Sequence, residues 1–263
     1  MELDYEEVEK LALDTIAAAE ERGIHLRLLG AMAFRIHCPV HHHLQISMHR
    51  VLTDLDFAAY YKEEKKIDKF FVGELGFESQ QASLTPGLML GRKIYLDPRG
   101  EQPHIDVFFD KLNMCHVVSW EKGRLGIDKL TLSLADLMLE KLQIVHINEK
   151  DVIDLMMLLR EHEIGNHDNE VINSAYISWL LCKDWGFYHT ATTNLNKVKS
   201  LLGNYDALSS VDREVISGRI DELLDAIERE PKSVGWKLRA RVGTKKQWYC
   251  DVEEVERAEH LLD

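Results

Sequence analysis

Two aspartates separated by a single residue stand inside an apolar stretch of the chain. Asp54 and Asp56 lie in HRVLTDLDFAAYY, residues 49–61, whose other residues are typical of a β-strand. Residues i and i+2 of a strand project from the same face, so the two carboxylates would lie roughly 7 Å apart at the backbone. They repel each other, and at least one pKa rises unless a cation neutralises them. The pair therefore predicts a site for a hard divalent cation, Mg²⁺ or Mn²⁺.

A third carboxylate stands in a second apolar stretch, PHIDVFFD, residues 103–110. Asp106 is flanked there by Ile105 and Val107, as in the interior of a strand. Three aspartates on strands can line one cleft and hold two metal ions, an arrangement that activates an attacking oxygen and stabilises a leaving one in phosphoryl transfer. Asp110 comes at the end of the same stretch and is interpreted as a turn residue.

A glycine turn precedes these motifs, in LLGAMAF, residues 28–34. Gly30 lies between a predicted strand and a predicted helix, and Ala31 follows it. Glycine lets a backbone approach a phosphate closely, and the first amides of a helix favour an anion. Joined to the three aspartates, the turn indicates a phosphate-binding position at the amides of Gly30 and Ala31.

The order of the motifs resembles the DNA-polymerase-β-like nucleotidyltransferase superfamily. The matching stretches are Leu29-Gly30-Ala31, Leu52-Thr53-Asp54-Leu55-Asp56-Phe57 and Ile105-Asp106-Val107. The resemblance implies Mg²⁺- or Mn²⁺-dependent transfer of a nucleoside monophosphate from an NTP to an acceptor hydroxyl, with release of pyrophosphate. Asp54 and Asp56 would hold the metal, and Asp106 would complete the site and help deprotonate the acceptor. Ala31 replaces the usual glycine or serine, which removes a hydroxyl but keeps the amide.

A helical stretch, LADLMLEKLQIVHINEKDVIDLMMLL at residues 134–159, is similar to the AbiEii-like nucleotidyltransferases of abortive-infection and toxin–antitoxin systems. This resemblance covers residues 25–160. It implies that Lys141 contacts nucleotide phosphates and that Asp154, on the next helix, supports the site. It also implies an antitoxin protein as a partner and favours an RNA acceptor, especially a tRNA 3′ end.

The residues themselves leave both of these roles open. Lys141 falls on an apolar helical stripe, so its side chain either snorkels to water or meets an anion in a cleft. Asp154 shares a polar stripe with Asp151 and Glu161, and a solvated helix face explains it about as well as a site does.

The elements that must position these residues change in character along the chain. Up to about residue 120 strands alternate with helices, and the remaining sequence is mostly helical in pattern. We therefore predict an α+β or α/β fold in which residues 1–125 form the nucleotidyltransferase domain, a mixed sheet flanked by helices. Residues 126–263 would form a helical domain, with the active site in the cleft between the two. The stretch KDWGFYHT, residues 183–190, is predicted to join two helices and to pack between them.

The net charge of −13 argues against a protein that binds nucleic acid non-specifically. Residues 232–250 are nevertheless basic and interleaved with aromatic residues. Lys237, Arg239 and Arg241 in this segment are candidate contacts to an RNA acceptor, and a charged β-ribbon or surface loop is the alternative. A protein hydroxyl or a small molecule such as an antibiotic is an equally consistent acceptor, and a catalytically weak or inactive nucleotide- or RNA-binding protein is a further alternative.

Cysteine usage and hydropathy suggest a cytoplasmic protein. The four cysteines are far apart, and no run of 18 apolar residues or signal-peptide core is present in the sequence. We expect reduced thiols and no membrane partner. The histidine-rich stretch at residues 35–50 is predicted to be a polar loop rather than a zinc site, because no second Cys/His cluster stands at ligand spacing.

Overall fold

The centre of the molecule is a five-stranded mixed sheet with the strand order β1-β2-β5-β4-β3. The computed structural model describes residues 4–80 and 91–250, and within them the protein is α+β. Strands β2 and β5 are parallel neighbours, whereas the other pairs are antiparallel. The five strands are β1 (Arg27–Leu29), β2 (Asp54–Ala59), β3 (Glu78–Gln80), β4 (Arg92–Leu96) and β5 (His104–Phe109).

The register of the sheet gathers the polar residues of three strands. Asp56 pairs with Asp106 across the parallel strands, and Asp54 pairs with His104. Leu29, the last residue of β1, lies opposite Asp56. Strand β2 alternates as its sequence predicts, with Leu55 and Phe57 fully buried and the two aspartates partly exposed. One face of this strand therefore belongs to the core and the other carries the acids.

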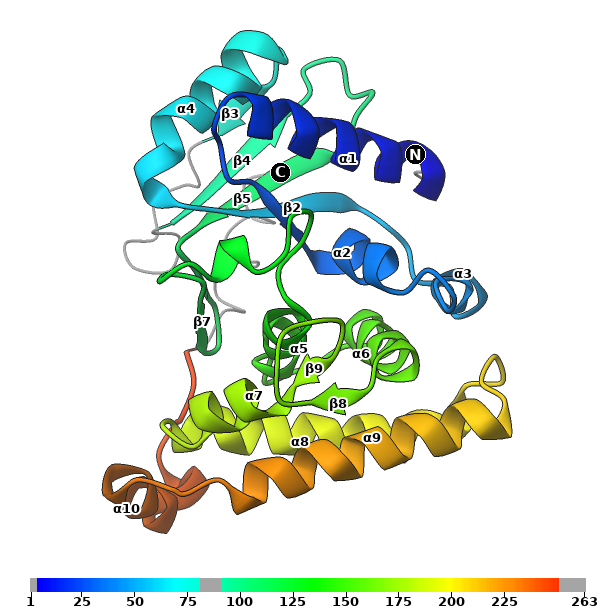
Figure 1. Ribbon diagram of the computed structural model, residues 1–263, viewed down its shortest axis with the longest axis vertical. Coiled ribbons are helices and arrows are strands. Elements are labelled where there is room, and N and C mark those ends of the chain that lie inside the picture. The colour runs from blue at the N-terminus through cyan, green and yellow to red at the C-terminus, as the bar shows by residue number, and fades with distance from the viewer. Residues whose placement is uncertain (1–3, 81–90, 251–263) are drawn as a thin grey trace.

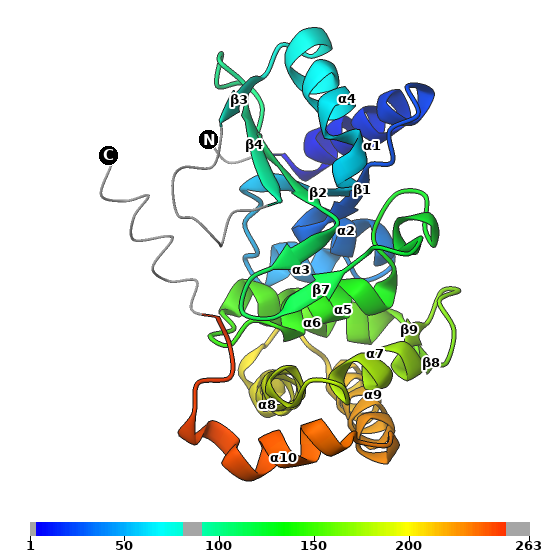
Figure 2. The same cartoon turned by 90° about the vertical axis from the view of Figure 1, so that its left-hand side faces the viewer.

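Helices α1 (Tyr5–Glu21) and α4 (Glu64–Asp68) pack beside the sheet (Figures 1 and 2). A six-residue π-helix, η2 (Lys69–Glu74), continues α4. Asp68 holds this layer to β4, because it accepts hydrogen bonds from Lys93 Nζ at 2.5 Å and Tyr95 Oη at 2.6 Å. Helix α1 begins after Asp4, whose side chain accepts from two backbone amides of its first turn.

The chain leaves the sheet region through two short helices and a small hairpin. Helix α2 (Gly30–His37) starts directly at the glycine turn and contacts both α5 and α6. The remaining elements of this part are α3 (His43–Ser47), the short 3-10 helices η1 (Tyr61–Glu63) and η3 (Arg124–Gly126), and the hairpin strands β6 (Lys111–Asn113) and β7 (Val117–Ser119). The predicted boundary near residue 125 falls on η3.

The second half of the chain is helical, as predicted, and lies below the sheet in Figure 1. Its helices are α5 (Leu134–Leu142), α6 (Glu149–Glu161), α7 (Ser174–Leu181), α8 (Trp185–Leu201), α9 (Ser210–Arg229) and α10 (Val234–Val242), with short strands β8 (Ile164–Gly165) and β9 (Ile172–Asn173) and 3-10 helices η4 (Leu202–Asn204) and η5 (Gly243–Lys245). Ser133 caps α5, and Asn148 and Ser209 form capping boxes on α6 and α9. One hydrophobic cluster runs from α1 to α9, so the two predicted domains share a core.

Two expectations about the second half are wrong in part. Only the first two residues of the stretch 183–190 lie between α7 and α8, because α8 already begins at Trp185, where the Asp184 side chain accepts from the amides of Gly186 and Phe187. The packing expectation holds for Phe187, which is buried in the core. The basic segment 232–250 is not a ribbon or loop throughout. It forms α10, which begins where Ser233 accepts from the amide of Trp236. The sequence pattern also predicts a strand at residues 88–96 and a helix at residues 251–263; part of that strand and all of that helix lie outside the described residues.

The histidine-rich stretch also contains more regular structure than the predicted loop. Helix α3 lies within it, and Ile46 on that helix is exposed whereas Leu44 is buried. Among the described helices, none is both long enough and apolar enough to cross a membrane.

Candidate active site

The predicted acids line a cavity of about 400 Å³ between the sheet and helices α5 and α6. Asp54, Asp56 and Asp106 all contribute to its wall. Lys141 faces the same cavity from α5, whereas Asp154 is not among its lining residues. Three further charged residues that the motifs did not predict also line it: Arg92, Glu140 and Asp151.

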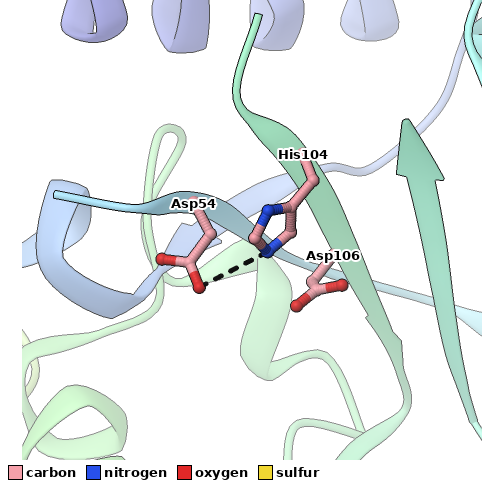
Figure 3. A group of neighbouring side chains, drawn as sticks. All are labelled: Asp54, His104 and Asp106. Atoms are coloured by element: carbon pink, nitrogen blue, oxygen red, sulfur yellow. Dashed lines mark ion pairs between the residues drawn. The ribbon is translucent and has the colours of Figure 1, made fainter. Parts of the chain in front are cut away.

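Asp54 lies beside the imidazole of His104. The distance from His104 Nε2 to Asp54 Oδ2 is 3.6 Å, and Figure 3 shows the ring between the carboxylates of Asp54 and Asp106. Burial raises the pKa of Asp54, but its interactions with His104 and Thr53 outweigh burial and leave that pKa below its ordinary value. The same contact with Asp54 raises the pKa of His104. The pair therefore favours a carboxylate next to an imidazolium when no other cation is present.

Asp106 is the most deeply buried of the three aspartates, with 2% of its surface exposed. Its Oδ2 accepts from Arg92 Nη2 at 2.5 Å, and its buried Oδ1 has no hydrogen-bond partner among the described residues. Burial raises the pKa of this carboxyl even though Arg92 opposes the shift. An unpaired buried carboxylate oxygen is costly, so this atom is suited to a cation or a proton.

Asp56 faces the glycine turn. A Cβ atom at Gly30 would lie 2.3 Å from Asp56 Oδ2, which shows how closely this carboxylate approaches the backbone. Gly30 has a φ of +67°, a left-handed conformation that side chains rarely adopt. Burial, followed by the charges of Asp54 and Asp106, raises the pKa of Asp56 well above its ordinary value. Both the space and the backbone angle explain why this position holds a glycine.

The side chains that are best placed for a shared metal ion are not the predicted trio. Ligand atoms of Asp54, His104 and Asp106 all lie within 4.8 Å of one another, and this is the one such group of three among the described residues. Asp56 is outside it. Two carboxylates and an imidazole suit a divalent cation, and the unpartnered Asp106 Oδ1 adds an acceptor that such a cation would satisfy. The residues present therefore fit a metal ion.

The glycine turn is already engaged by a carboxylate. The Gly30 amide donates to Glu140 Oε2 at 3.1 Å, and Glu140 Oε1 lies 3.1 Å from Lys141 Nζ. Burial raises the pKa of Glu140, and Lys141 and the Gly30 amide oppose the shift. Ala31 is buried and its carbonyl accepts from Gln45 Nε2 at 3.1 Å. Glu140 therefore lies where the motifs predicted a nucleotide phosphate.

Lys141 does not snorkel to water. Its side chain is buried, and Nζ lies 3.2 Å from Asp151 and 3.4 Å from Asp154 in addition to its contact with Glu140. Burial lowers the pKa of Lys141, but the three carboxylates outweigh it and raise the pKa overall. Of the two alternatives, contact with an anion in a cleft is therefore the correct one for Lys141. The anions that it contacts are carboxylates of the protein itself.

The solvated-face interpretation of Asp154 is wrong. This side chain is fully buried and accepts from Arg50 Nη2 at 3.2 Å as well as facing Lys141. The residue that pairs with it is 104 positions away, so the helical stripe alone did not indicate burial. Asp154 therefore supports Lys141 without lining the cavity itself.

A second and larger cavity, of about 990 Å³, adjoins the first through Cys115 and Tyr249, which line both. Arg239 lines this second cavity, whereas Lys237 and Arg241 are not among its described lining residues. Arg239 donates to the carbonyls of Gly243 and Lys246 and lies over the Trp185 ring at 4.8 Å. Its guanidinium therefore also holds the turn after α10.

The histidine-rich stretch contributes to neither cavity. His41 Nδ1 contacts Glu161 at 2.5 Å, and His37 Nε2 contacts Thr131 Oγ1 at 2.5 Å. These histidines bind α2 and α3 to later parts of the chain, and the described residues of the stretch form no metal-binding group of three. The four cysteines are free thiols in the structure, and Cys250 alone is exposed.

Sequence reasoning missed His104 and Glu140, although one of them left a signal. His104 stands two residues before Asp106, so strand periodicity alone places it on the same face. Glu140 left no comparable signal, because its partner Gly30 is 110 residues away.

Comparisons with protein-family models, with curated proteins and with solved structures find no match for this chain.

Proposed function

We propose that this protein is a metal-dependent nucleotidyltransferase of the DNA-polymerase-β-like type that resembles the AbiEii-like group. It would transfer a nucleoside monophosphate from an NTP to an acceptor hydroxyl and release pyrophosphate. The observation that carries the proposal is the set of three aspartates on two adjacent parallel strands, which line one cavity beside a glycine turn. The motif order supports the proposal at the level of the sequence, and the shared cavity supports it at the level of the fold.

The proposed reaction assigns a task to each acid. A divalent cation, when bound, supplies positive charge to the phosphates; Asp54 and Asp106, which lie beside His104, would hold it, and Asp56 lines the same cavity. Asp106 helps to deprotonate the acceptor hydroxyl, for which its raised pKa suits it. A bond forms between the acceptor oxygen and the α-phosphorus, and the bond to the bridging oxygen breaks as pyrophosphate leaves.

The contacts of Glu140 define what nucleotide binding requires. A triphosphate that uses the Gly30 amide and Lys141 must displace the Glu140 carboxylate from both of them. The same contacts favour the alternative of a weak or inactive protein that binds nucleotide without transferring it. Nucleotide binding measured separately from transfer distinguishes the two functions.

An RNA 3′ end, such as that of tRNA, is the acceptor that the second cavity supports best. Its wall combines cations with aromatic rings, and single-stranded nucleic acid binds to such surfaces by phosphate contacts and base stacking. The side chains concerned are Lys122, Arg124, Lys183 and Lys246 together with Tyr176, Trp179, Trp248 and Tyr249. A small molecule such as an antibiotic, a protein hydroxyl, an antitoxin partner and a cytoplasmic location stay predictions from the sequence.

The experiment incubates the protein with Mg²⁺ or Mn²⁺, total RNA and each of the four α-³²P-labelled NTPs. We expect label on RNA, and we expect it to vanish in the Asp54→Ala/Asp56→Ala variant. The matched control is Asp110→Asn, because Asp110 follows the same strand as Asp106, has a φ of +61° that asparagine tolerates and lines neither cavity. Undiminished labelling by the double variant would refute the proposal.

A further inference from the structure

His104 lies on the same sheet face as Asp54 and Asp106. It precedes Asp106 by two residues on β5, so both side chains project from one face of that strand. The parallel register sets it opposite Asp54 on β2. At 3.6 Å, its Nε2 is too far from Asp54 Oδ2 for a direct hydrogen bond, although the two groups face each other.

Asp106 supplies an independent observation that points to a ligand. The side chain is 98% buried, and its Oδ1 has no hydrogen-bond partner in the described part of the chain. A carboxylate oxygen in this state normally finds a donor, an ordered water or a cation. Figure 3 shows this carboxylate and that of Asp54 on either side of the His104 ring.

The charge of the surrounding cavity also favours a cation. Asp54, Asp56, Asp106, Glu140 and Asp151 line it, against the two permanent cations Arg92 and Lys141. Lys141 is shared among three of the acids of α5 and α6. The sheet side of the cavity therefore carries excess negative charge that a divalent ion would neutralise.

We propose that Asp54, His104 and Asp106 form a mixed oxygen–nitrogen site that binds Mn²⁺ in preference to Mg²⁺. Mg²⁺ takes oxygen ligands in a strict octahedral arrangement, whereas an imidazole nitrogen suits first-row transition metals. Ligand atoms that are about 2.1 Å from one ion lie about 3–4 Å apart, so the observed limit of 4.8 Å closes with small side-chain movements. The inference deepens the proposed function by naming the metal, and it is tested by metal binding alone.

The experiment measures Mn²⁺ binding to the full chain by the loss of the free-ion electron paramagnetic resonance signal. Electron spin-echo modulation of the bound ion reports whether a ¹⁴N nucleus is coordinated. We expect nitrogen modulation in the wild type and none in His104→Ala, together with a loss of Mn²⁺ affinity of at least about tenfold. Mg²⁺ affinity, measured by competition, should change less than Mn²⁺ affinity.

The matched control is His25→Ala. His25 is similarly half-exposed and likewise lies beside a carboxylate, with Nδ1 2.9 Å from Glu63, but it belongs to no group of three possible metal ligands among the described residues. Its removal should leave both Mn²⁺ affinity and the nitrogen signal unchanged. Wild-type protein without nitrogen modulation, or His104→Ala with unchanged Mn²⁺ affinity, would overturn the inference.

The two experiments distinguish failure of the proposed metal site from failure of the proposed transfer activity. Nitrogen-coordinated Mn²⁺ without label on RNA would support the site and refute transfer to an RNA acceptor. Label transfer with bound Mn²⁺ that shows no nitrogen modulation would support the transferase and refute the role of His104.

Discussion

At the scale of single residues, Gly30 is the position where sequence, backbone and site depend most directly on one another. Its left-handed φ allows α2 to begin at once after β1, and the missing side chain leaves room for Asp56. Its amide is the donor that Glu140 accepts. Any side chain here must strain the backbone and also move a carboxylate of the site.

We predict that Gly30→Ala abolishes nucleotide transfer and lowers the free energy of unfolding by more than Gly23→Ala does. Gly23 has a φ of +65°, close to that of Gly30, but the nearest atom to its Cβ position is Lys66 Nζ at 3.9 Å. Gly23→Ala should therefore lower the free energy of unfolding through backbone strain alone, by about 1–2 kcal/mol. Chemical denaturation measures both variants, and equal losses would contradict the proposed clash with Asp56.

Lys141 is the second residue whose removal has a defined consequence. Replacing it with methionine leaves Glu140, Asp151 and Asp154 buried without their shared cation. We expect Lys141→Met to lower the free energy of unfolding by about 3–5 kcal/mol. Lys199→Met, which breaks an ion pair with Asp221 that is more exposed, should change it by less than about 1 kcal/mol. A small effect at Lys141 would mean that the carboxylates are protonated or solvated.

At the scale of elements, the hairpin β6–β7 is joined to helix α8 by a buried histidine. The His116 ring stacks on Phe187 at 4.9 Å, and its Nε2 lies 2.9 Å from Thr190 Oγ1. Burial lowers the pKa of His116 from 6.5 to about 4, although Asp184 opposes the shift. This contact therefore requires a neutral imidazole.

The sign of the pH dependence follows from that shift. Between pH 6.5 and about 4 the unfolded chain binds a proton at His116 that the folded chain does not, so stability falls as the pH falls through this window. One such proton corresponds to a slope of about 1.4 kcal/mol per pH unit. We expect His116→Gln to remove this contribution, whereas His43→Gln, at an exposed position, should keep it. Urea unfolding at several pH values measures the slopes, and parallel curves for the two variants would contradict the assignment.

At the scale of the whole molecule, the end of the described chain returns to the site. The Cys250 amide donates to the Cys115 carbonyl at 3.0 Å, which brings Tyr249 to the junction of the two cavities. The acidic cavity of the sheet and the basic, aromatic cavity of the helical part are therefore adjacent. This division suits a nucleotide and metal in one and a nucleic-acid acceptor in the other.

We predict that Lys122→Ala/Lys246→Ala raises the KM for an RNA acceptor several-fold and makes it less sensitive to salt, because phosphate contacts are lost. Nucleotide binding should be unaffected. Lys237→Ala/Lys245→Ala is the matched control, since it removes the same charge from residues of the basic segment that do not line the cavity. If both double variants raise the KM for RNA equally, the lysines act by non-specific attraction, and the cavity is not a specific binding site for the acceptor.

The sequence by itself determined the features that depend on local periodicity. The period of two in a strand put Asp54 and Asp56 on one face, and in the structure both aspartates lie on β2 and line one cavity. The mixed α+β class and the helical second half followed from the same patterns.

Only the tertiary structure decided which groups share a site. Asp54 meets His104 through strand register, Glu140 meets Gly30 across 110 residues, and Asp154 meets Arg50 across 104. The sequence did not determine whether Lys141 is buried, because the periodicity of a helix does not identify the residues that pack against it. Register and packing join segments that are distant along the chain, and no local pattern encodes the partner. For this reason the acids of the site could be predicted individually, whereas their pairing with His104, Arg92 and Glu140 could not.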